Sequence, residues 1–100
     1  MATTSKALFR GAAATSNTTL YTVPSATTTI VTNILVANTA ATSATFDLSL
    51  DDVQIANDVT VAANDTLTID LKQTLAATKT IKGLASATTV NFHISGVEIS

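Results

Sequence analysis

Residues 18–38 read TTLYTVPSATTTIVTNILVAN, and this stretch decides the fold. Two runs rich in β-branched residues flank Val23-Pro24-Ser25, and Pro24 separates them because proline cannot donate to a strand ladder. The second run, residues 28–38, is apolar at both odd and even positions. Successive side chains of a strand point to opposite faces, so this strand needs apolar cover on both sides. The core supplies one cover, and the nature of the other is the functional question.

The composition indicates a single all-β domain. A chain of 100 residues supports one domain, and its charged fraction of 12% is about half of the usual ~25%. Threonine, valine and isoleucine, which suit a pleated strand, are abundant. Cysteine is absent, which excludes a disulfide framework and a thiolate zinc site. The net charge of −2 offers no basic footprint for nucleic acid.

Targeting signals are also missing from the sequence. No apolar run reaches the ~20 residues that span a bilayer, so we expect no membrane partner. The N-terminal residues MATTSKALFRGAAATS lack the hydrophobic region of a secretory signal. We therefore expect a protein that is made in a cytoplasm and kept there until it is assembled into something larger.

Strand signals recur at short intervals after residue 17. The predicted strands cover residues 18–23, 28–38, 45–50, 53–55, 59–61, 66–71, 80–82 and 89–99, while residues 72–79 carry weak helix propensity. Such spacing predicts a small antiparallel β-sandwich of seven or eight strands, jelly-roll-like, over residues 18–100. Residues 1–17 are interpreted as an extended N-terminal arm. A bulge at Gly96 would bring Val97 and Ile99 to the inward face.

The residues that could carry catalysis or bind metal are better explained by structure. His93 is the only histidine, and no Gly-x-Ser-x-Gly elbow accompanies it. The aspartates, such as Asp51, Asp52 and Asp58, match no calcium loop and are typical of turns. We therefore expect no enzyme activity, no metal and no cofactor.

The surface pattern favours association with other proteins. The predicted outer faces carry mainly Thr, Ala, Ser and Asn, which lose little side-chain entropy on burial, and few charges guard the edges. The arm residues Leu8, Phe9 and Arg10 are the predicted contact to a neighbouring protein. Val31 and Leu35 are the predicted contact for self-association as a dimer or trimer. A third layer within the chain, from the arm or residues 72–79, is the alternative cover for the second face.

Three stretches resemble small virion proteins of tailed bacteriophages. They are LYTVPSATTTIVTNILVANTA at 20–40, VAANDTLTIDLKQTL at 61–75 and TTVNFHISGVEIS at 88–100. The resemblance spans residues 18–99 and implies a β-sandwich that attaches to a capsid or tail and has no enzymatic role. It brings no catalytic or binding residues with it.

Three functions are weighed on these grounds. The first is a capsid decoration, or cement, protein of the virion that binds the outer shell and bridges major capsid subunits. The second is a tail or head-fibre accessory protein that helps the virion attach to its host. The third, a small carbohydrate-binding or hydrolytic domain, is disfavoured because Tyr21 is the only tyrosine and tryptophan is absent. Copy number in the particle separates the first two.

Overall fold

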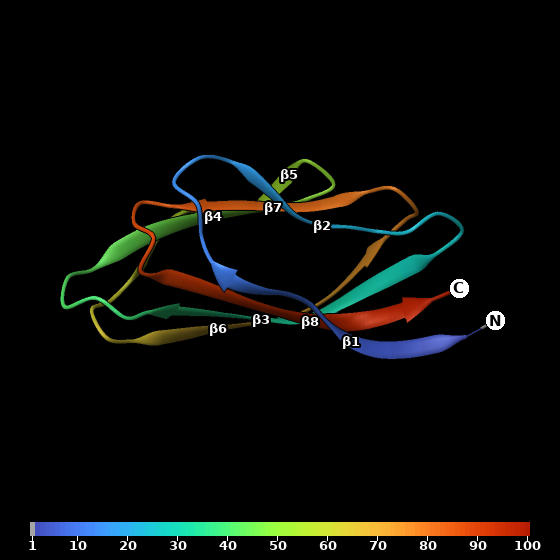
Figure 1. Ribbon diagram of the computed structural model, residues 1–100, viewed down its shortest axis with the longest axis horizontal. Coiled ribbons are helices and arrows are strands. Elements are labelled where there is room, and N and C mark those ends of the chain that lie inside the picture. The colour runs from blue at the N-terminus through green and yellow to red at the C-terminus, as the bar shows by residue number, and fades with distance from the viewer. Residues whose placement is uncertain (1) are drawn as a thin grey trace.

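Eight strands form the regular structure of residues 2–100, the part of the chain that the computed structural model describes. Their bounds are β1 Thr3–Ala12, β2 Thr18–Thr22, β3 Thr28–Asn38, β4 Ala44–Leu50, β5 Val53–Val61, β6 Thr66–Leu75, β7 Thr80–Ala85 and β8 Val90–Ile99. They make two four-stranded antiparallel sheets, sheet A in the order β1-β8-β3-β6 and sheet B in the order β2-β7-β4-β5. Figure 1 shows sheet A below sheet B.

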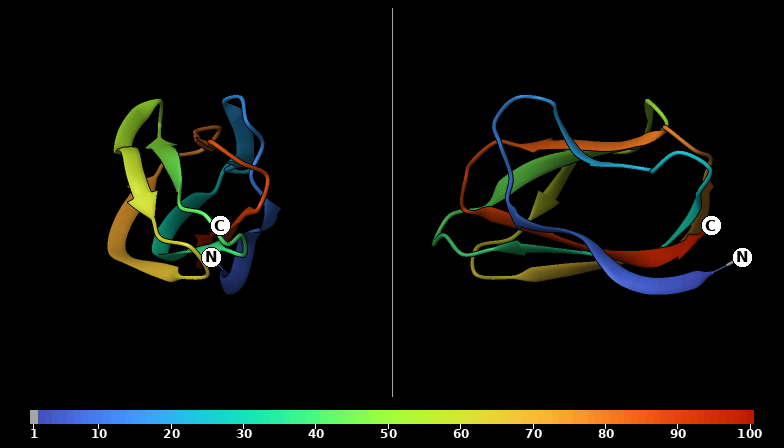
Figure 2. Two further views of the ribbon diagram at one scale, coloured as in Figure 1. Left: turned by 90° about the vertical axis from the view of Figure 1, so that its left-hand side faces the viewer. Right: turned by 45° about the vertical axis from the view of Figure 1, so that its right-hand side comes forward.

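This strand order is that of an eight-stranded jelly roll. Neighbouring strands come from opposite ends of the chain, so that β1 and β2 lie beside β8 and β7 respectively. The arrangement is the double-sheet form built from two Greek keys. The predicted all-β sandwich with jelly-roll character is confirmed, and Figure 2 shows its two layers from the end and obliquely.

The core lies between the two sheets and is aliphatic around one aromatic pair. Phe46 of β4 and Phe92 of β8 meet edge to face with ring centroids 6.0 Å apart and an interplanar angle of 70°. This geometry is favoured by the ring quadrupoles. The other large side chains that are fully buried are Ile34, Leu48, Ile81, Ile94, Val23, Val31, Val36 and Val90.

The N-terminal segment is a strand of the fold, so the predicted free arm is wrong for residues 3–12. β1 pairs with β8 from Thr3↔Ile99 to Ala12↔Asn91, and Leu8 joins the core at 8% exposure. Without β1, β8 would present an unpaired edge along its whole length. Leu8 and Phe9 are therefore covered by their own chain, while Ala7 remains exposed. Residues 13–17 connect β1 to β2, and Met1 lies outside the described residues.

The predicted bulge at Gly96 is wrong, because the bulges lie on the two neighbouring strands, β1 and β3. β8 runs through Gly96 without interruption, while the register shifts at Leu8 on β1 and at Thr32 on β3. Gly96 is needed there because a Cβ atom would fall within 3.0 Å of the Ile30 carbonyl oxygen and of Leu8 Cδ1. The strands pack too closely at Gly96 for the bulge to lie on β8. Val97 and Ile99 consequently stay on the outer face.

Strands β5, β6 and β7 extend beyond their predicted limits, and β7 reaches Ala85 where the prediction ends at Lys82. β5 runs unbroken from Val53 to Val61 with register shifts opposite Asp47 and at Ile55, where the sequence predicts a gap. β6 continues to Leu75, which is buried, so the weak helix propensity of residues 72–79 is overridden. Burial of Leu75 against the core explains the second difference, because tertiary packing outweighs a weak local preference.

Asp51, Asp52 and Asn64 lie in turns as predicted, whereas Asp58 lies within β5. Asp51, Asp52, Asp58 and Asn64 have φ between 49° and 60°, the left-handed region that these residues tolerate. Asp58 sits in the β5 irregularity, where its N–H donates to Asp47 Oδ1 at 2.8 Å. The aspartates thus have a structural role in the backbone.

The two ends of the described chain lie side by side at one tip of the sandwich. Ala2 and Ser100 exchange two backbone hydrogen bonds, with N···O distances of 2.8 and 2.9 Å. Figure 1 shows N and C together at the right-hand tip.

Candidate interaction surfaces

The outer face of sheet A carries an apolar patch that the chain only partly covers. The patch consists of Ile30 and Leu35 on β3 and Val97 and Ile99 on β8, all half-buried. Ile30 lies opposite Val97 in the register, and Ile99 opposite Thr28. Leu35 lies opposite His93 and is separated from the other three side chains by the row Asn33↔Ser95, while threonine, serine, alanine and asparagine make up most of the other neighbours. Within residues 2–100, no third layer lies over this face of β3, so its apolar side chains are left for another molecule to cover.

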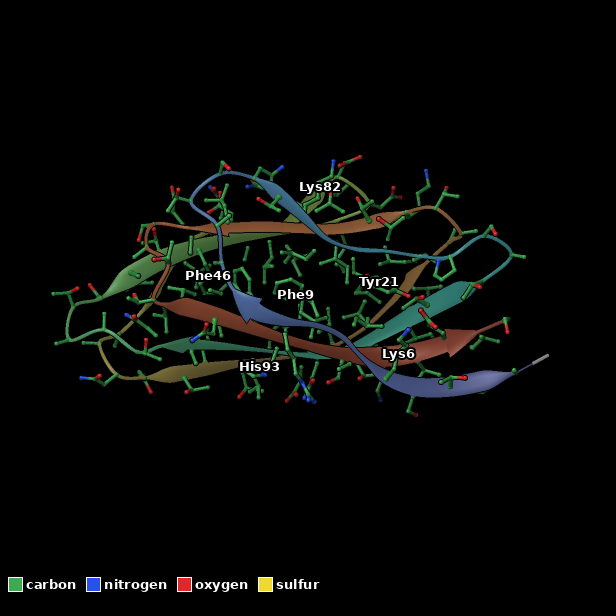
Figure 3. All side chains as sticks on the ribbon, in the orientation of Figure 1. Lys6, Phe9, Tyr21, Phe46, Lys82 and His93 are labelled. Carbon is green, nitrogen blue, oxygen red and sulfur yellow. The ribbon has the colours of Figure 1, made fainter. Side chains whose placement is uncertain are left out.

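Few charges interrupt this face, and they lie near its edges. Arg10 is exposed on edge strand β1, opposite His93, whereas Asp70 and Lys72 are exposed on edge strand β6. Figure 3 shows His93 pointing away from the core on this side. Sheet B and its turns hold more of the charge, including the ion pairs Lys79–Asp51 at 3.6 Å and Lys82–Asp52 at 2.9 Å.

A shallow hollow indents the β6 side of the sheet A face. Its volume is about 510 Å³, and Thr32, Asp70, Leu71 and Lys72 line it. The hollow lies where β3 bulges at Thr32 and β6 carries one residue more than β3 between paired positions. The bulge therefore creates a depression beside a negative charge at one edge of an otherwise pleated surface.

The bulge at Thr32 also separates two residues that the sequence places on one face. Val31 is fully buried in the core at 0% exposure, while Leu35 stays on the outer face. The predicted shared face of Val31 and Leu35 is therefore wrong, because one inserted residue reverses the side-chain parity. Among the arm residues, Leu8 is buried and Phe9 packs against the core. Arg10 is exposed, and β8 joins it to Leu35 in one register row: Arg10↔His93↔Leu35.

Edge strand β5 holds a second exposed apolar site that sequence reasoning missed. Val53 is 66% exposed and Ile55 is 42% exposed, more than any other large hydrophobic side chain in residues 2–100. The sequence predicts only a short strand over residues 53–55. The register shift at Ile55 and the edge position leave both side chains uncovered. In the sequence, the Asp51-Asp52 turn that joins β4 to β5 is the one sign that β5 belongs to a hairpin at the edge of the sheet.

A polar cluster ties the two sheets together at the tip that holds the chain ends. The Tyr21 hydroxyl of sheet B donates to Glu98 of sheet A and accepts from the Thr29 hydroxyl at 2.9 Å. Lys6 Nζ lies 3.4 Å from the other Glu98 oxygen, and the Glu98 side chain is 16% exposed. Burial, together with the hydrogen bond and negative charge of Glu98, raises the pKa of Tyr21 to about 12. The cluster is a cross-sheet tie, with Tyr21 and Lys6 labelled in Figure 3.

Asn38 secures the loops at the opposite tip. Its side chain is 2% exposed and its amide nitrogen donates to the carbonyls of Thr42, Val61 and Ala62, the shortest bond being 2.8 Å. Its oxygen accepts from Ala40 N at 3.1 Å and from Thr89 Oγ1 at 3.2 Å. A buried polar residue with every group satisfied specifies one arrangement of its neighbours.

No chemical centre appears among the described residues. Residues 2–100 hold no group of three or more His, Cys, Asp or Glu side chains that could hold a metal ion. In the same range, no helix is long and apolar enough to cross a membrane. The surfaces above are accordingly the features on which a functional interpretation can be built.

Comparison with solved structures finds distant structural similarity. No protein-family profile and no curated protein matches the chain. Two solved structures of pentameric capsid proteins isolated from metagenomic phage sequences are similar in fold: one is 14% identical with a TM-score of 0.41, the other 16% identical with a TM-score of 0.33. Each alignment covers 94% of this chain but only 59% and 60% of those proteins. Similarity this low carries no argument about function.

Proposed function

We propose that this chain is a phage structural protein and, within that class, a capsid decoration protein. The observation that carries the proposal is the outer face of sheet A, where the apolar patch is bordered by only three charged side chains, Arg10, Asp70 and Lys72. Such a face is inexpensive to desolvate and serves packing against protein. The sequence resemblance to small virion proteins supports the same class.

The proposed mechanism is thermodynamic. A protein that binds the assembled shell but not its free subunits stabilises the shell by mass action. When one bound molecule makes two contacts with the shell at once, the two contacts together bind more tightly than either alone. The predicted lattice contact through a free arm has to be revised, because Leu8 is buried and β1 is part of sheet A. We assign the lattice contact to the β5 edge, where exposed Val53 and Ile55 accompany unpaired backbone groups that can accept an added strand.

The second candidate is a tail or head-fibre accessory protein involved in attachment to the host. The sequence resemblance includes this kind of protein. The scarcity of exposed aromatic residues disfavours it, because the chain has four aromatic residues, of which Phe46 and Phe92 are fully buried and Phe9 and Tyr21 pack against the core.

Copy number tests the proposal directly. Quantitative mass spectrometry of purified particles that contain this chain should find hundreds of copies per particle, and a density map of the particle should show a matching layer on the outside of the shell. Shells stripped of the protein should break at lower temperature and recover on its addition. The variant Val53→Asp should fold normally but fail to restore the shell. A count of a few copies to a few dozen, confined to the tail, would favour the accessory role.

A further inference from the structure

We infer that the outer face of sheet A is a two-fold interface between two copies of this chain. The axis lies in the plane of contact and runs along the strands. Each copy then presents the same face to the other, with β1 of one copy over β6 of the second and β8 over β3. The inference does not depend on where the protein acts.

The apolar patch is placed for this arrangement. Its four side chains all lie on β3 and β8, the two central strands of sheet A. An axis between these strands therefore brings Ile30 of each copy over Val97 of the other, while Leu35 lies over His93. Residues at the edges of the patch would form the rim, where small polar side chains dominate. A central apolar region with a polar rim is the usual anatomy of a protein interface.

The charges on the face are complementary under the same symmetry. Arg10 lies on the β1 edge and Asp70 on the β6 edge, so the rotation brings Arg10 of each copy towards Asp70 of the other. Arg10 lies level with Thr68, because the register pairs Arg10 with His93, His93 with Leu35 and Leu35 with Thr68 across the four strands. Asp70 is one two-residue step further along β6, about 7 Å, a distance that an extended arginine side chain spans. Each dimer would contain this pair twice.

The hollow beside Asp70 provides the space for the incoming side chain. Its volume of about 510 Å³ exceeds what one arginine needs, and Thr32 and Leu71 line it with Asp70. Lys72 also borders the hollow and repels Arg10, so the attraction depends on the direct pair with Asp70. The exposed Arg10 on one edge and the hollow on the other make the face self-complementary in shape as well as charge.

The area of the face is sufficient for a weak but specific dimer. Strands of ten or eleven residues at ~3.4 Å per residue give a length of roughly 33 Å, and four strands at ~4.8 Å give a width of roughly 19 Å. The face then contributes roughly 600 Å² per copy, or about 1,200 Å² in total, the lower limit of stable interfaces. We expect a dissociation constant in the micromolar range.

Charge reversal tests the inference. Sedimentation equilibrium of the full chain should show a monomer–dimer equilibrium. Either Arg10→Asp or Asp70→Arg alone should raise the dissociation constant about tenfold, since each reversal creates two like-charge contacts per dimer. An equimolar mixture of the two variants should form heterodimers with near wild-type affinity, because both pairs are then opposite in sign. Native mass spectrometry identifies the heterodimer by its mass.

The matched controls separate this interface from the proposed lattice contact. Leu35→Asp should abolish the dimer, while Val53→Asp, on the opposite sheet, should leave the dissociation constant unchanged. Circular dichroism checks that each variant folds. If Leu35→Asp does not fold, the exposed variants Arg10→Asp and Asp70→Arg still test the interface. A wild-type chain that stays monomeric at hundreds of micromolar, a closed trimer or pentamer, or a mixture without preference for heterodimers would overturn the inference. If a variant lost binding to the shell but still formed the dimer, the result would bear on the proposed function and would leave the dimer interface standing.

Discussion

Replacing Gly96 with alanine should destabilise the fold, and the structure sets the magnitude. The added Cβ would lie within 3.0 Å of the Ile30 carbonyl oxygen and 2.9 Å from Leu8 Cδ1. Overpacking costs about 1–3 kcal/mol, and a backbone contact belongs at the upper end because β3 cannot move without breaking its ladder with β8. The gain from a less flexible unfolded chain offsets about 0.5–1 kcal/mol. The net loss in the free energy of unfolding is about 2 kcal/mol.

Thermal and denaturant unfolding of the three glycine variants gives a scale within one protein for the cost of the added Cβ. Gly96→Ala should lower the melting temperature by about 10 °C, given ~4–8 °C per kcal/mol for a domain of this size. Gly83→Ala should lose an amount of stability between those of Gly96→Ala and Gly11→Ala. Its added Cβ would lie 2.8 Å from Leu48 Cδ2, which belongs to a side chain that can move, and 3.1 Å from the Asp47 carbonyl oxygen. Gly11→Ala, whose nearest neighbour is Phe9 Cζ at 3.3 Å, should stay within ~0.5 kcal/mol of wild type. Equal stability of Gly96→Ala and Gly11→Ala would refute the close packing of β1, β8 and β3.

Three further predictions concern single side chains. Thr78→Asn should raise the free energy of unfolding by about 1 kcal/mol, as measured by denaturant titration, because a β-branched residue at φ 70° is unfavourable in the left-handed region. Asn38→Ala should cost about 2 kcal/mol in the same assay, because it leaves buried backbone groups unpaired; a near-neutral result would show that water replaces the side chain. Glu98→Gln should lower the pKa of Tyr21 from about 12 while burial keeps it above 10.0, and ultraviolet titration can follow this change because the chain has one tyrosine and no tryptophan. Since the folded pKa exceeds the unfolded one, the Tyr21 proton stabilises the fold at neutral pH, and that stability is lost as pH rises from 10 through 12; an unchanged titration in Glu98→Gln would contradict the hydrogen bond.

Local sequence signals were sufficient for the fold class and for most strands. β3 has its predicted limits because its β-branched run ends at Asn38 and a loop of small residues follows. Alternation likewise located the inward faces of β4 and of the first half of β6. The partner of β1 could not be found in this way. Its pairing with β8 joins opposite ends of the chain, and only that long-range contact turns a polar, Ala-rich segment into a strand.

The candidate surface was only partly accessible to sequence reasoning. The alternation of side chains along β3 is enough to predict that its second face is apolar and that Leu35 lies on it. Val31 was misplaced because a bulge at Thr32 has no local signature: the sequence there is an uninterrupted strand pattern, and the bulge forms where β3 meets close-packed Gly96. Arg10 enters the face only through the pairing of β1, so its neighbourhood with Leu35 is a property of the sheet and not of any segment.

The adjacency of Ala2 and Ser100 makes the order of the strands along the chain adjustable. A short glycine-serine linker can join these two residues without crossing the sandwich, and new ends can be opened at the exposed Asp51-Asp52 turn. In such a circular permutant, β5 would come first and β4 last, while all eight strands keep their neighbours. The same geometry means that peptides grafted next to Ala2 and Ser100 would emerge from a single tip, spaced by one strand width.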